Sequence, residues 1–564
     1  FSDEQFCDLL CRTRKQFQEA QKPSPFVFGE KTFFGVMPDW NPAEIIGTKP
    51  RRLALSLYRY LITDEVWALQ RLQAGYRNVS PLPLLRSFAG HPYVDIRASF
   101  NSFIPSSLPD ALAEKLVNHY LQRLEENPHF HDKIEFDIAF TCLDLDFVRQ
   151  SDRLREANFN EEEISIIRHS LKEITCKAIT TYKNYFKEFE LIEERFSLIT
   201  TSTLSPLHKA MALLEDCRKY GTLPFAHLAR SAFIAIALLK SMVSKGFLSP
   251  HQSECFFNSL QTVGKRMQIE AHKVIEGDIN WEKFVKTYGH LRPGTYEITS
   301  ASYAEDAEVY LRPLLSKENA DLSIASEDFD MDKEMSGNFD ECFKEMGFSC
   351  DLKTLESFMR EAIEGREFSK FVFSRNLSQA LNYIVDFGKE QNLSRDQLSH
   401  IFFEDYRAAA IGIPAPQISQ WFHEKAEEGS AWYELTQAVE LPPVLFDEDD
   451  LFAFQLPKSH PSFVGREQVV AQILDLVYEK LKDTDLCGKI VLIPQADPGY
   501  DWLFGKQIAG LITMYGGPNS HMTIRAAEFG LPAAIGIGES EYKRISRASV
   551  VELDCAHRCL RIIQ

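Results

Sequence analysis

The chain has 564 residues, of which 45% are hydrophobic, and its formal net charge is −19. This length predicts roughly two to four domains with sizeable cores, and the acidic balance argues against a nucleic-acid partner, because binding to a phosphate backbone needs a basic surface. The eleven cysteines contain no Cys-x-x-Cys pair and their number is odd, which indicates reduced thiols in a cytoplasmic protein rather than disulfides or a metal site.

The first 105 residues are punctuated by prolines and glycines, which predicts a mixture of short strands and loops. Two polar segments lie within them. Residues 35–47 carry Asp39, Asn41 and Glu44, and residues 90–103 alternate apolar and polar side chains like a half-exposed strand. The chain begins at Phe1 with residues typical of the interior of a folded protein, so we expect further chain before it.

Residues 108–435 are expected to be mainly helical. Apolar side chains recur at three- and four-residue steps over 164–178, after Asn160, and Ser249 is the N-cap of a second helical segment. Residues 370–391 predict another long helix. The apolar stretch 232–239 is too short to cross a bilayer and predicts a buried helix, so we expect no membrane partner.

A third polar segment, residues 288–297, is a glycine and proline loop that contains His290, Arg292 and Glu297. Prolines and four consecutive acidic residues then predict an extended linker over 441–463. It separates a mainly helical domain, residues 1–440, from a small α/β domain, residues 464–564. In the latter we expect a helix over 466–481, followed by strands over 489–494, 508–514, 533–537 and 550–553.

The strongest chemical signal lies near the end of the chain. The strand over 508–514 leads into Gly516 and Gly517, where the backbone can approach an anion closely, and Ser520 is placed as the N-cap of a helix that starts with His521. Unpaired N–H groups and the helix dipole there favour a neutral, nucleophilic imidazole and stabilise a phosphate bound to it. We interpret His521 as an exposed phosphohistidine; the alternative is a helix that happens to start with histidine.

The residues from 513 to 532 resemble the swivelling phosphohistidine domain of the phosphoenolpyruvate synthase and pyruvate phosphate dikinase superfamily, as does the Asp-Pro-Gly turn over 497–499. The resemblance covers roughly residues 455–564. It implies that His521 is the transient covalent nucleophile and that the phosphate is bound by Thr513, Gly516, Gly517 and Ser520. The family usually has an arginine at the position of Ala527, whereas this chain has Arg525, which leaves that phosphate contact in doubt.

The three polar segments and residues 366–375 loosely resemble the acceptor-binding domain of rifampin-type phosphotransferases over residues 30–410. A pocket that receives a phosphoryl group needs cations for its oxygens and a base for the nucleophile. The expected acceptor-binding residues are Asp39, Asn41, Glu44, Asp95, Arg97, Asn101, His290, Arg292, Glu297 and Arg375. The same arginines could instead form ordinary structural ion pairs.

Two parts that the superfamily can contain are missing. Only 43 residues follow His521, too few for a phosphoenolpyruvate-binding barrel of about 250 residues. No glycine-rich nucleotide motif is found either. The resemblance therefore implies that ATP and Mg²⁺ are bound mainly by an ATP-grasp domain before residue 1 or in a separate partner, from which His521 receives the β-phosphoryl group with release of AMP and phosphate.

The expected fold is thus multidomain, with a largely α-helical acceptor-binding domain followed by a small α/β swivelling phosphohistidine domain. The expected function is AMP-forming phosphotransfer to a small molecule. Similarity to proteins encoded with capsular polysaccharide genes suggests the side-chain amide of L-glutamine as the acceptor. Two alternatives stay open: phosphorylation of a hydroxyl on a bulky apolar compound, and a non-catalytic scaffold or phosphocarrier.

Overall fold

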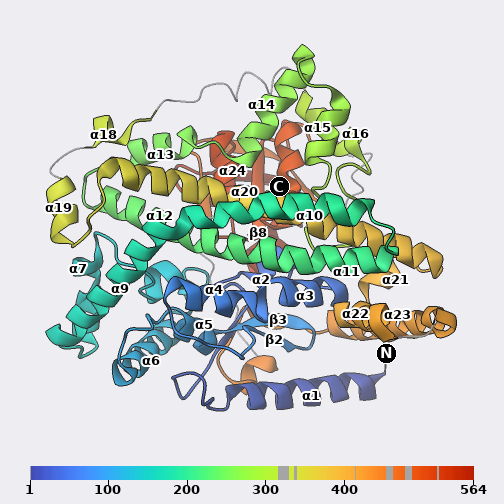
Figure 1. Ribbon diagram of the computed structural model, residues 1–564, viewed down its shortest axis with the longest axis horizontal. Helices are drawn as coiled ribbons and strands as arrows, with labels where there is room; N and C mark the ends of the chain where they lie inside the picture. The colour runs from blue at the N-terminus through green and yellow to red at the C-terminus, as the bar shows by residue number, and fades with distance from the viewer. Residues whose placement is uncertain are drawn as a thin grey trace.

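The computed structural model describes residues 2–315, 329–335, 339–412, 415–452, 461–476, 485–517 and 520–564. It shows a mostly helical N-terminal body and a smaller C-terminal part built around a sheet (Figure 1). The first elements of the body lie on one side of the long helices, and the C-terminal part lies behind those helices, with its sheet close to the centre of the molecule. This arrangement places the C-terminal part in direct contact with the body.

The N-terminal region combines helices with a small antiparallel sheet of strand order β2-β3-β1-β4. Its strands are β1 (Phe34–Gly35), β2 (Leu85–Phe88), β3 (His91–Asp95) and β4 (Val444–Leu445). Its helices are α1 (Asp3–Gln21), α2 (Pro42–Ile45), α3 (Arg52–Tyr58), η1 (Arg59–Thr63), α4 (Val66–Ala74) and α5 (Ile96–Ser102). Residues 90–103 were expected to be one half-exposed strand, which is wrong: they change from β3 to α5 at Asp95, and residues 91–103 are buried.

The described residues between 110 and 437 are mainly helical, as expected. Its longest helix is α20 (Leu352–Glu390), which packs along α11 and α12 and buries one face along most of its length. The remaining helices are α6 (Asp110–Glu126), η2 (Pro128–Phe130), η3 (Ile134–Ile138), α7 (Phe147–Gln150), α8 (Asp152–Glu156), α9 (Glu161–Thr181), η4 (Tyr182–Phe186), α10 (Lys187–Thr201), α11 (Pro206–Asp216), η5 (Cys217–Thr222), α12 (Leu223–Ser244), α13 (Pro250–Ser259), α14 (Val263–Glu276), α15 (Trp281–Tyr288), α16 (Ala307–Tyr310), η6 (Arg312–Leu315), α18 (Met331–Glu334), α19 (Phe339–Glu345), α21 (Arg395–Ser399), α22 (Phe403–Gly412) and α23 (Ala415–Gln437).

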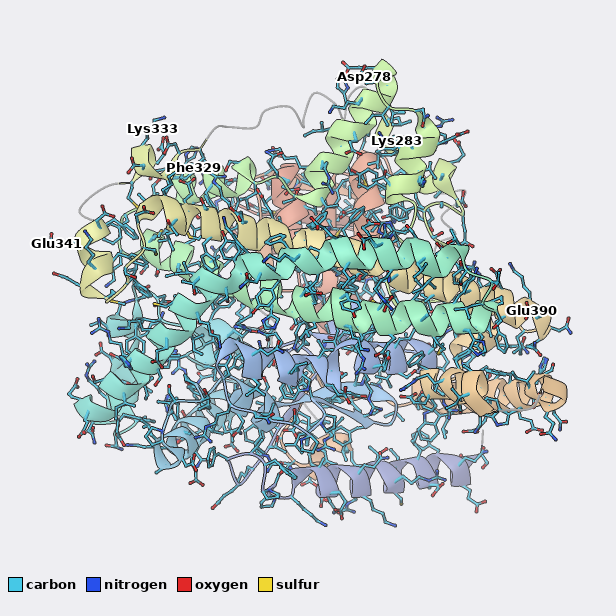
Figure 2. All side chains as sticks on the ribbon, viewed as in Figure 1. Asp278, Lys283, Phe329, Lys333, Glu341 and Glu390 are labelled. Carbon is cyan, nitrogen blue, oxygen red and sulfur yellow. The ribbon has the colours of Figure 1, made fainter. Side chains whose placement is uncertain are left out.

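The capping arrangement expected at Ser249 is confirmed, and Asn160 forms a second one. The side chains of Asn160 and Ser249 each accept a hydrogen bond from the backbone of the third residue of their helices, and those third residues bond back to the cap. The segment Pro206–Ser244 is long and apolar enough to cross a membrane by length and composition, but 78% of its most apolar window is buried inside the protein. A core helix passes the same test. Charged side chains, such as Asp278, Lys283 and Glu390, lie at the periphery (Figure 2).

The C-terminal part contains a seven-stranded sheet of order β11-β10-β6-β7-β8-β9-β5. Its four central strands, β6 to β9, are parallel, and the outer strands are antiparallel to their neighbours. Its elements are β5 (Ser462–Val464), β6 (Gln468–Asp475), β7 (Ile490–Gln495), η8 (Pro498–Gly505), β8 (Gly510–Tyr515), α24 (His521–Glu528), β9 (Ala533–Ile535), α25 (Glu539–Ile545), β10 (Val550–Asp554) and β11 (Cys559–Ile562).

Four strands agree with the sequence analysis, but the helix expected over 466–481 is wrong. Residues 468–475 form strand β6 instead, between β7 and β10, and residues 477–481 lie outside the described residues. The side chains of β6 alternate between more and less exposed positions before two buried residues. Val469, Val470 and Ile473 are β-branched, which favours a pleated, half-buried surface and outweighs the amphipathic helical pattern.

The linker expected over 441–463 is partly built into the body. Val444 and Leu445 pair with β1, because two apolar residues complete the small sheet there. The acidic run after them forms a 3-10 turn, η7 (Glu448–Leu451), in which Glu448 is 2.8 Å from Arg14 of α1. The repulsion between the acidic side chains is relieved because Asp447 caps the turn and Arg14 pairs with Glu448. Residues 453–460 lie outside the described residues. The division into domains itself stays a prediction.

One hydrophobic cluster joins the body to the C-terminal part. Tyr303 and Tyr310 of the body pack with Trp502 and Leu503 of η8, and the ring centroids of Tyr310 and Trp502 are 5.8 Å apart. The cluster also contains residues of α14, α15, β7, β8 and α24. The interface that holds α24 against the body is therefore apolar as well as charged.

Candidate functional site

The N-terminus of α24 has the geometry that the sequence predicted. Ser520 has extended backbone angles and its Oγ accepts a hydrogen bond from the N–H of Thr523 at 3.3 Å, so it is the N-cap. His521 is the first helical residue. The hydroxyl of Thr523 donates to the carbonyl of Gly517 at 2.9 Å and ties the helix to the preceding loop.

The loop before α24 follows the end of β8. Gly516 has a φ of +150°, and a Cβ atom there would lie 2.7 Å from the Cβ of Ala496, so the turn requires glycine. Thr513 is fully buried and its Oγ1 accepts a hydrogen bond from the N–H of Gly536 at 3.0 Å. These contacts make Thr513 and Gly516 part of the support of the loop. Their role as phosphate ligands, with Gly517 and Ser520, stays a prediction.

His521 lies between two carboxylates. Its Nδ1 is 2.6 Å from Oε2 of Glu367, in helix α20 of the body, and its Nε2 is 2.7 Å from Oδ1 of Asp501, in η8 of its own C-terminal part. The side chain is 12% exposed, and those of Glu367 and Asp501 are 9% and 7% exposed. The expectation of an exposed junction is therefore wrong, because the body covers the N-terminus of α24.

These carboxylates determine the charge of His521. Burial opposes the imidazolium, but Asp501 and then Glu367 outweigh it and raise the pKa of His521 to about 9. For Glu367, burial opposes the carboxylate, but His521, followed by Arg366 and Lys370, lowers its pKa to about 2. The sequence predicted a neutral imidazole from the helix dipole. Two full negative charges within hydrogen-bonding distance exceed that partial charge, so the docked His521 is an imidazolium at neutral pH.

Arg525 stands one turn after His521. It forms an ion pair with Glu528 and its Nε is 3.6 Å from Oδ1 of Asp501. Thr262 of the body donates to Glu528 at 2.8 Å, and a Cβ atom on Gly264 would overlap the guanidinium of Arg525. Arg525 therefore fastens α24 to the body and to Asp501 rather than contacting His521.

A small cavity of about 40 Å³ opens beside His521. Helix α20 contributes Glu367, Lys370, Ser374 and Ser378 to its lining, which are three or four residues apart and so share one helix face. Lys370 makes no hydrogen bond or ion pair with any described residue, although its charge acts on Glu367. Glu367, Lys370 and Asp501 were not among the site residues expected from the sequence. The spacing of polar residues within 366–375 was the signal for the first two.

Two expected acceptor-binding residues, His290 and Arg292, line the same cavity. The Nε2 of His290 donates to the carbonyl of Phe371 at 3.0 Å, and burial, with the charge of Arg375, lowers its pKa to about 3. Arg292 donates to Ser378 and Asn382 of α20, and burial lowers its pKa to about 10. Both side chains thus pin the 289–292 loop to α20. His290 is a neutral imidazole at this position.

Glu44 and Asn41 also face the C-terminal part. The Nδ2 of Asn41 donates a hydrogen bond to Glu44 at 3.3 Å. Burial raises the pKa of Glu44 to about 7, although the charges of Lys370 and Arg366 lower it. The charge of Asp497 raises it further. Burial also raises the pKa of Asp497, which lies on the other side of the interface. The structure therefore brings the 41–44 segment to the surroundings of Lys370.

The other expected acceptor-binding residues have structural partners. Asp39 is 2.6 Å from Arg71, and Asp95 caps α5 at the N–H of Ala98. Arg97 donates to the carbonyls of Gly29, Ala20 and Lys22, and Asn101 bonds to both backbone groups of Phe28. Glu297 accepts from Thr299, and Arg375 is 2.7 Å from Glu193. These six do not line the cavity beside His521.

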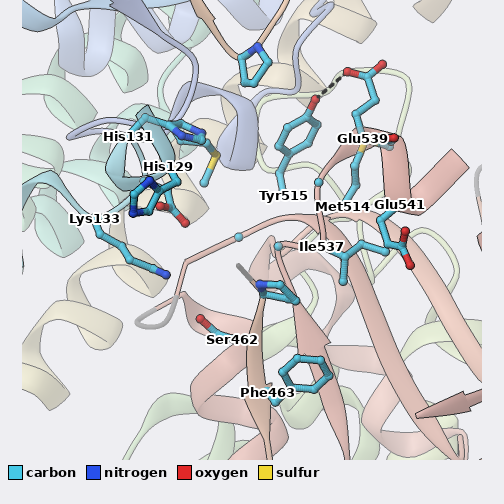
Figure 3. Close-up of a pocket in the computed structure, with 18 of the residues that line it drawn as sticks. His129, His131, Lys133, Ser462, Phe463, Met514, Tyr515, Ile537, Glu539 and Glu541 are labelled. Atoms are coloured by element: carbon cyan, nitrogen blue, oxygen red, sulfur yellow. Dashed lines mark hydrogen bonds between the residues drawn. The ribbon is translucent and has the colours of Figure 1, made fainter. Parts of the chain in front are cut away.

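A larger cleft, of about 850 Å³, lies at the ends of β8 and β9 (Figure 3). His129, His131 and Lys133 of the body face Ser462 and Phe463 across it. The hydroxyl of Tyr515 donates to Glu539 at 3.4 Å on its wall. The cleft reaches Gly516 but does not include His521 in its lining, so the chemistry of the chain is assigned to the smaller cavity.

The described residues contain no group of three or more His, Cys, Asp or Glu side chains arranged to hold a metal ion. Residues 487–558 match the family described as PEP-utilising enzyme, mobile domain. This match includes His521, Asp501 and Arg525 and supports the PEP-utilising enzyme superfamily. No curated protein matches the chain. The match of residues 487–558 to a mobile domain of the PEP-utilising type suggests a phosphotransferase of that superfamily.

Proposed function

We propose that the chain is the acceptor-binding and phosphohistidine part of an ATP-dependent, AMP-forming phosphotransferase. His521 receives the β-phosphoryl group of ATP and passes it to a small acceptor, for which the side-chain amide of L-glutamine is the best candidate. The observation that carries the proposal is the position of His521: it begins a helix in a segment that matches a mobile domain, and it is docked against a cavity of the helical body.

The docked histidine suits the end of the transfer step. During transfer the N–P bond of phospho-His521 breaks and a bond forms between phosphorus and the acceptor atom. The phosphoryl group is on Nδ1, where it displaces Glu367, and Nε2 keeps a proton that it donates to Asp501, so the ring leaves as a neutral imidazole. The acceptor loses one proton, and Nδ1 takes up one proton, which gives the imidazolium. Glu367, freed from His521 while the phosphoryl group is present, is placed to accept the first proton and hand it to the imidazole. The product is the imidazolium and carboxylate pair found in the structure.

The same pair gives a reason for the domain to move. An imidazolium has no lone pair with which to attack phosphorus, so the docked His521 cannot be phosphorylated. Asp501 belongs to the same domain as His521, whereas Glu367 belongs to the body. Undocking removes Glu367, one of the two carboxylates that hold a proton on His521, which favours a neutral nucleophile. We infer that phosphorylation takes place away from α20 and transfer takes place beside it.

Lys370 and the size of the cavity support a small acceptor. Lys370 lines the cavity without a bonded partner among the described residues, which leaves its three donors available to the oxygens of a phosphoryl group. A space of about 40 Å³ fits a phosphoryl group and the reacting end of a small molecule better than a bulky apolar compound. This favours an amide or another small acceptor over a rifampin-type substrate.

ATP and Mg²⁺ are proposed to bind mainly to an ATP-grasp domain, in the same protein or in a cytoplasmic partner. The mobile domain would carry only the phosphoryl group between the two sites. A non-catalytic phosphocarrier is the alternative in which the nucleotide domain is missing altogether.

Phosphorus NMR of the full-length protein with ATP, magnesium and L-glutamine tests the proposal. We expect a phosphoramidate resonance together with equal amounts of AMP and phosphate. His521→Ala should abolish both, whereas His557→Ala, at an exposed position (81%), should leave them unchanged. AMP without the phosphoramidate resonance would keep the phosphohistidine and replace the acceptor. Turnover retained in His521→Ala would contradict the central claim, and no ATP consumption with any acceptor would favour the phosphocarrier.

A further inference from the structure

A second, buried polar cavity lies within the helical body, between α4, α9 and α12. Its volume is about 20 Å³. Most of the polar side chains around it present hydrogen-bond donors, and these side chains are Gln70, Lys177, Thr181, His227, Arg230 and Ser231. None of them belongs to the site at His521.

Several donors at this cavity have no partner among the described residues. Arg230 is 5% exposed; its Nη2 donates to Glu135 at 2.6 Å, but its Nε and Nη1 make no hydrogen bond. Gln70 is fully buried; its Oε1 accepts from Arg71 at 3.2 Å, which leaves its Nε2 unpaired. A buried donor without an acceptor costs about 1–3 kcal/mol. Three such atoms around one cavity indicate a ligand that accepts hydrogen bonds.

The charges around the cavity do not balance. Arg71 is paired with Asp39 and Arg230 with Glu135, both at 2.6 Å. Lys177 is a third cation and forms no ion pair with a described residue. His227 is neutral, because burial, with the charges of Lys177 and Arg71, lowers its pKa to about 3. The surroundings of the cavity therefore carry one positive charge in excess.

We propose that this cavity binds one small monovalent anion, held by Arg230 and Gln70 and neutralised by Lys177. The shared chemistry is a compact hydrogen-bond acceptor with a single negative charge, either a free halide ion or the carboxylate end of an organic molecule. Lys177 is exposed and stands at the mouth of the cavity, which gives the anion a path from solvent.

This cavity lies close to the part of α20 that contacts His521. The guanidinium carbons of Arg230 and Arg366 lie 5.2 and 5.7 Å from the centroid of the same ring, Phe233. Arg366 directly precedes Glu367, which contacts His521. Asp39, one of the expected acceptor-binding residues, pairs with Arg71 next to this cavity.

Chloride-35 NMR on the full chain tests the proposal, with the line width of chloride measured against protein concentration. We expect excess broadening in the wild type. Lys177→Met removes the unbalanced charge and should weaken chloride binding roughly tenfold or more, since hydrogen bonds to charged groups contribute about 1.5–3 kcal/mol. Lys172→Met is the matched control, because Lys172 is in the same helix but does not line the cavity, and it should broaden like the wild type. Equal broadening in Lys177→Met and Lys172→Met would overturn the site.

A second variant, Gln70→Glu, places a carboxylate where the anion would lie. It should abolish the excess broadening, and its urea midpoint should no longer depend on chloride at constant ionic strength, whereas the wild type gains stability from chloride. A chloride-independent midpoint in the wild type would contradict the proposal. Acetate distinguishes the two sources of the anion. If acetate displaces bound chloride at a lower concentration than added chloride does, the site binds carboxylates. If acetate does not displace it, the site binds halides.

Discussion

Oε2 of Glu367 lies 2.6 Å from Nδ1 of His521, so a carboxylate of the body completes the surroundings of a histidine in the mobile domain. The other partner of that imidazole, Asp501, belongs to the same C-terminal part as His521. If that part leaves the body, as proposed above, His521 keeps Asp501 but loses Glu367. The proton affinity of His521 would then differ between the docked and the undocked position.

Replacing Glu367 by glutamine should lower the pKa of His521 from about 9. Glutamine keeps the size and a hydrogen-bonding oxygen but removes one of the two negative charges that stabilise the imidazolium. A neighbouring opposite charge changes a pKa by about 1 to 3. The measurement is a proton NMR titration of the ring hydrogens of His521. Glu390→Gln, at the exposed end of the same helix, is the control, and an unchanged pKa in Glu367→Gln would show that the two residues do not meet in solution.

Docking of the mobile domain should weaken as pH rises through about 9. The pKa of docked His521 is raised above its ordinary value of 6.5, so its stabilising contribution is complete below about 6.5 and is lost as the imidazolium loses its proton. Asp501 stays beside His521 after undocking, so only the share of the shift that is due to Glu367 favours docking, and the contribution is less than about 3 kcal/mol. Hydrogen exchange of amides in α24 and η8, corrected for the intrinsic effect of pH, should accelerate between pH 7 and pH 10. Amides of α12 should not, and equal acceleration in both regions would indicate global unfolding instead.

Lys370→Met should slow transfer from phospho-His521 to the acceptor by about 10²-fold, because the variant removes a cation that faces the transferred group. Formation of phospho-His521 should change only a few-fold, since that step is proposed to occur elsewhere. Single-turnover measurements with labelled ATP separate the two steps. Arg375→Met is the comparison: Arg375 is paired with Glu193 outside the cavity, and its loss should leave both steps within a few-fold. Equal losses in the two variants would make Lys370 structural.

Glu44→Gln should stabilise the protein above pH 7 and not near pH 4. Burial raises the pKa of Glu44 to about 7, so between about 4.5 and 7 the unfolded chain gives up a proton that the folded chain keeps, and stability falls. Glutamine has no such cost and keeps the acceptor for Asn41. The gain in the free energy of unfolding should reach at most about 3 kcal/mol. Urea unfolding at both pH values measures it, with the exposed Glu125→Gln as the control, and a gain that does not depend on pH would contradict this assignment.

The sequence predicted the local structure around His521 and much less of its surroundings. The glycine loop, the N-cap at Ser520 and the start of the helix at His521 each depend on residues close together in the sequence. Glu367 and Thr262 reach the site from far along the chain, and no local pattern shows which helix face meets α24. Arginines were the least predictable. Arg97, Arg292 and Arg375 were expected to bind phosphate, but each has protein partners, because a buried guanidinium needs acceptors wherever it lies.

The apolar cluster shared by Tyr303, Tyr310, Trp502 and Leu503 has a thermal consequence. Each departure of the mobile domain from the body exposes these side chains to water, and exposure of apolar surface raises the heat capacity. The hydrophobic part of the docking free energy weakens on cooling. At low temperature the C-terminal part should therefore spend more time away from the body. The free energy of docking should depend on temperature along a curve, because docking changes the heat capacity.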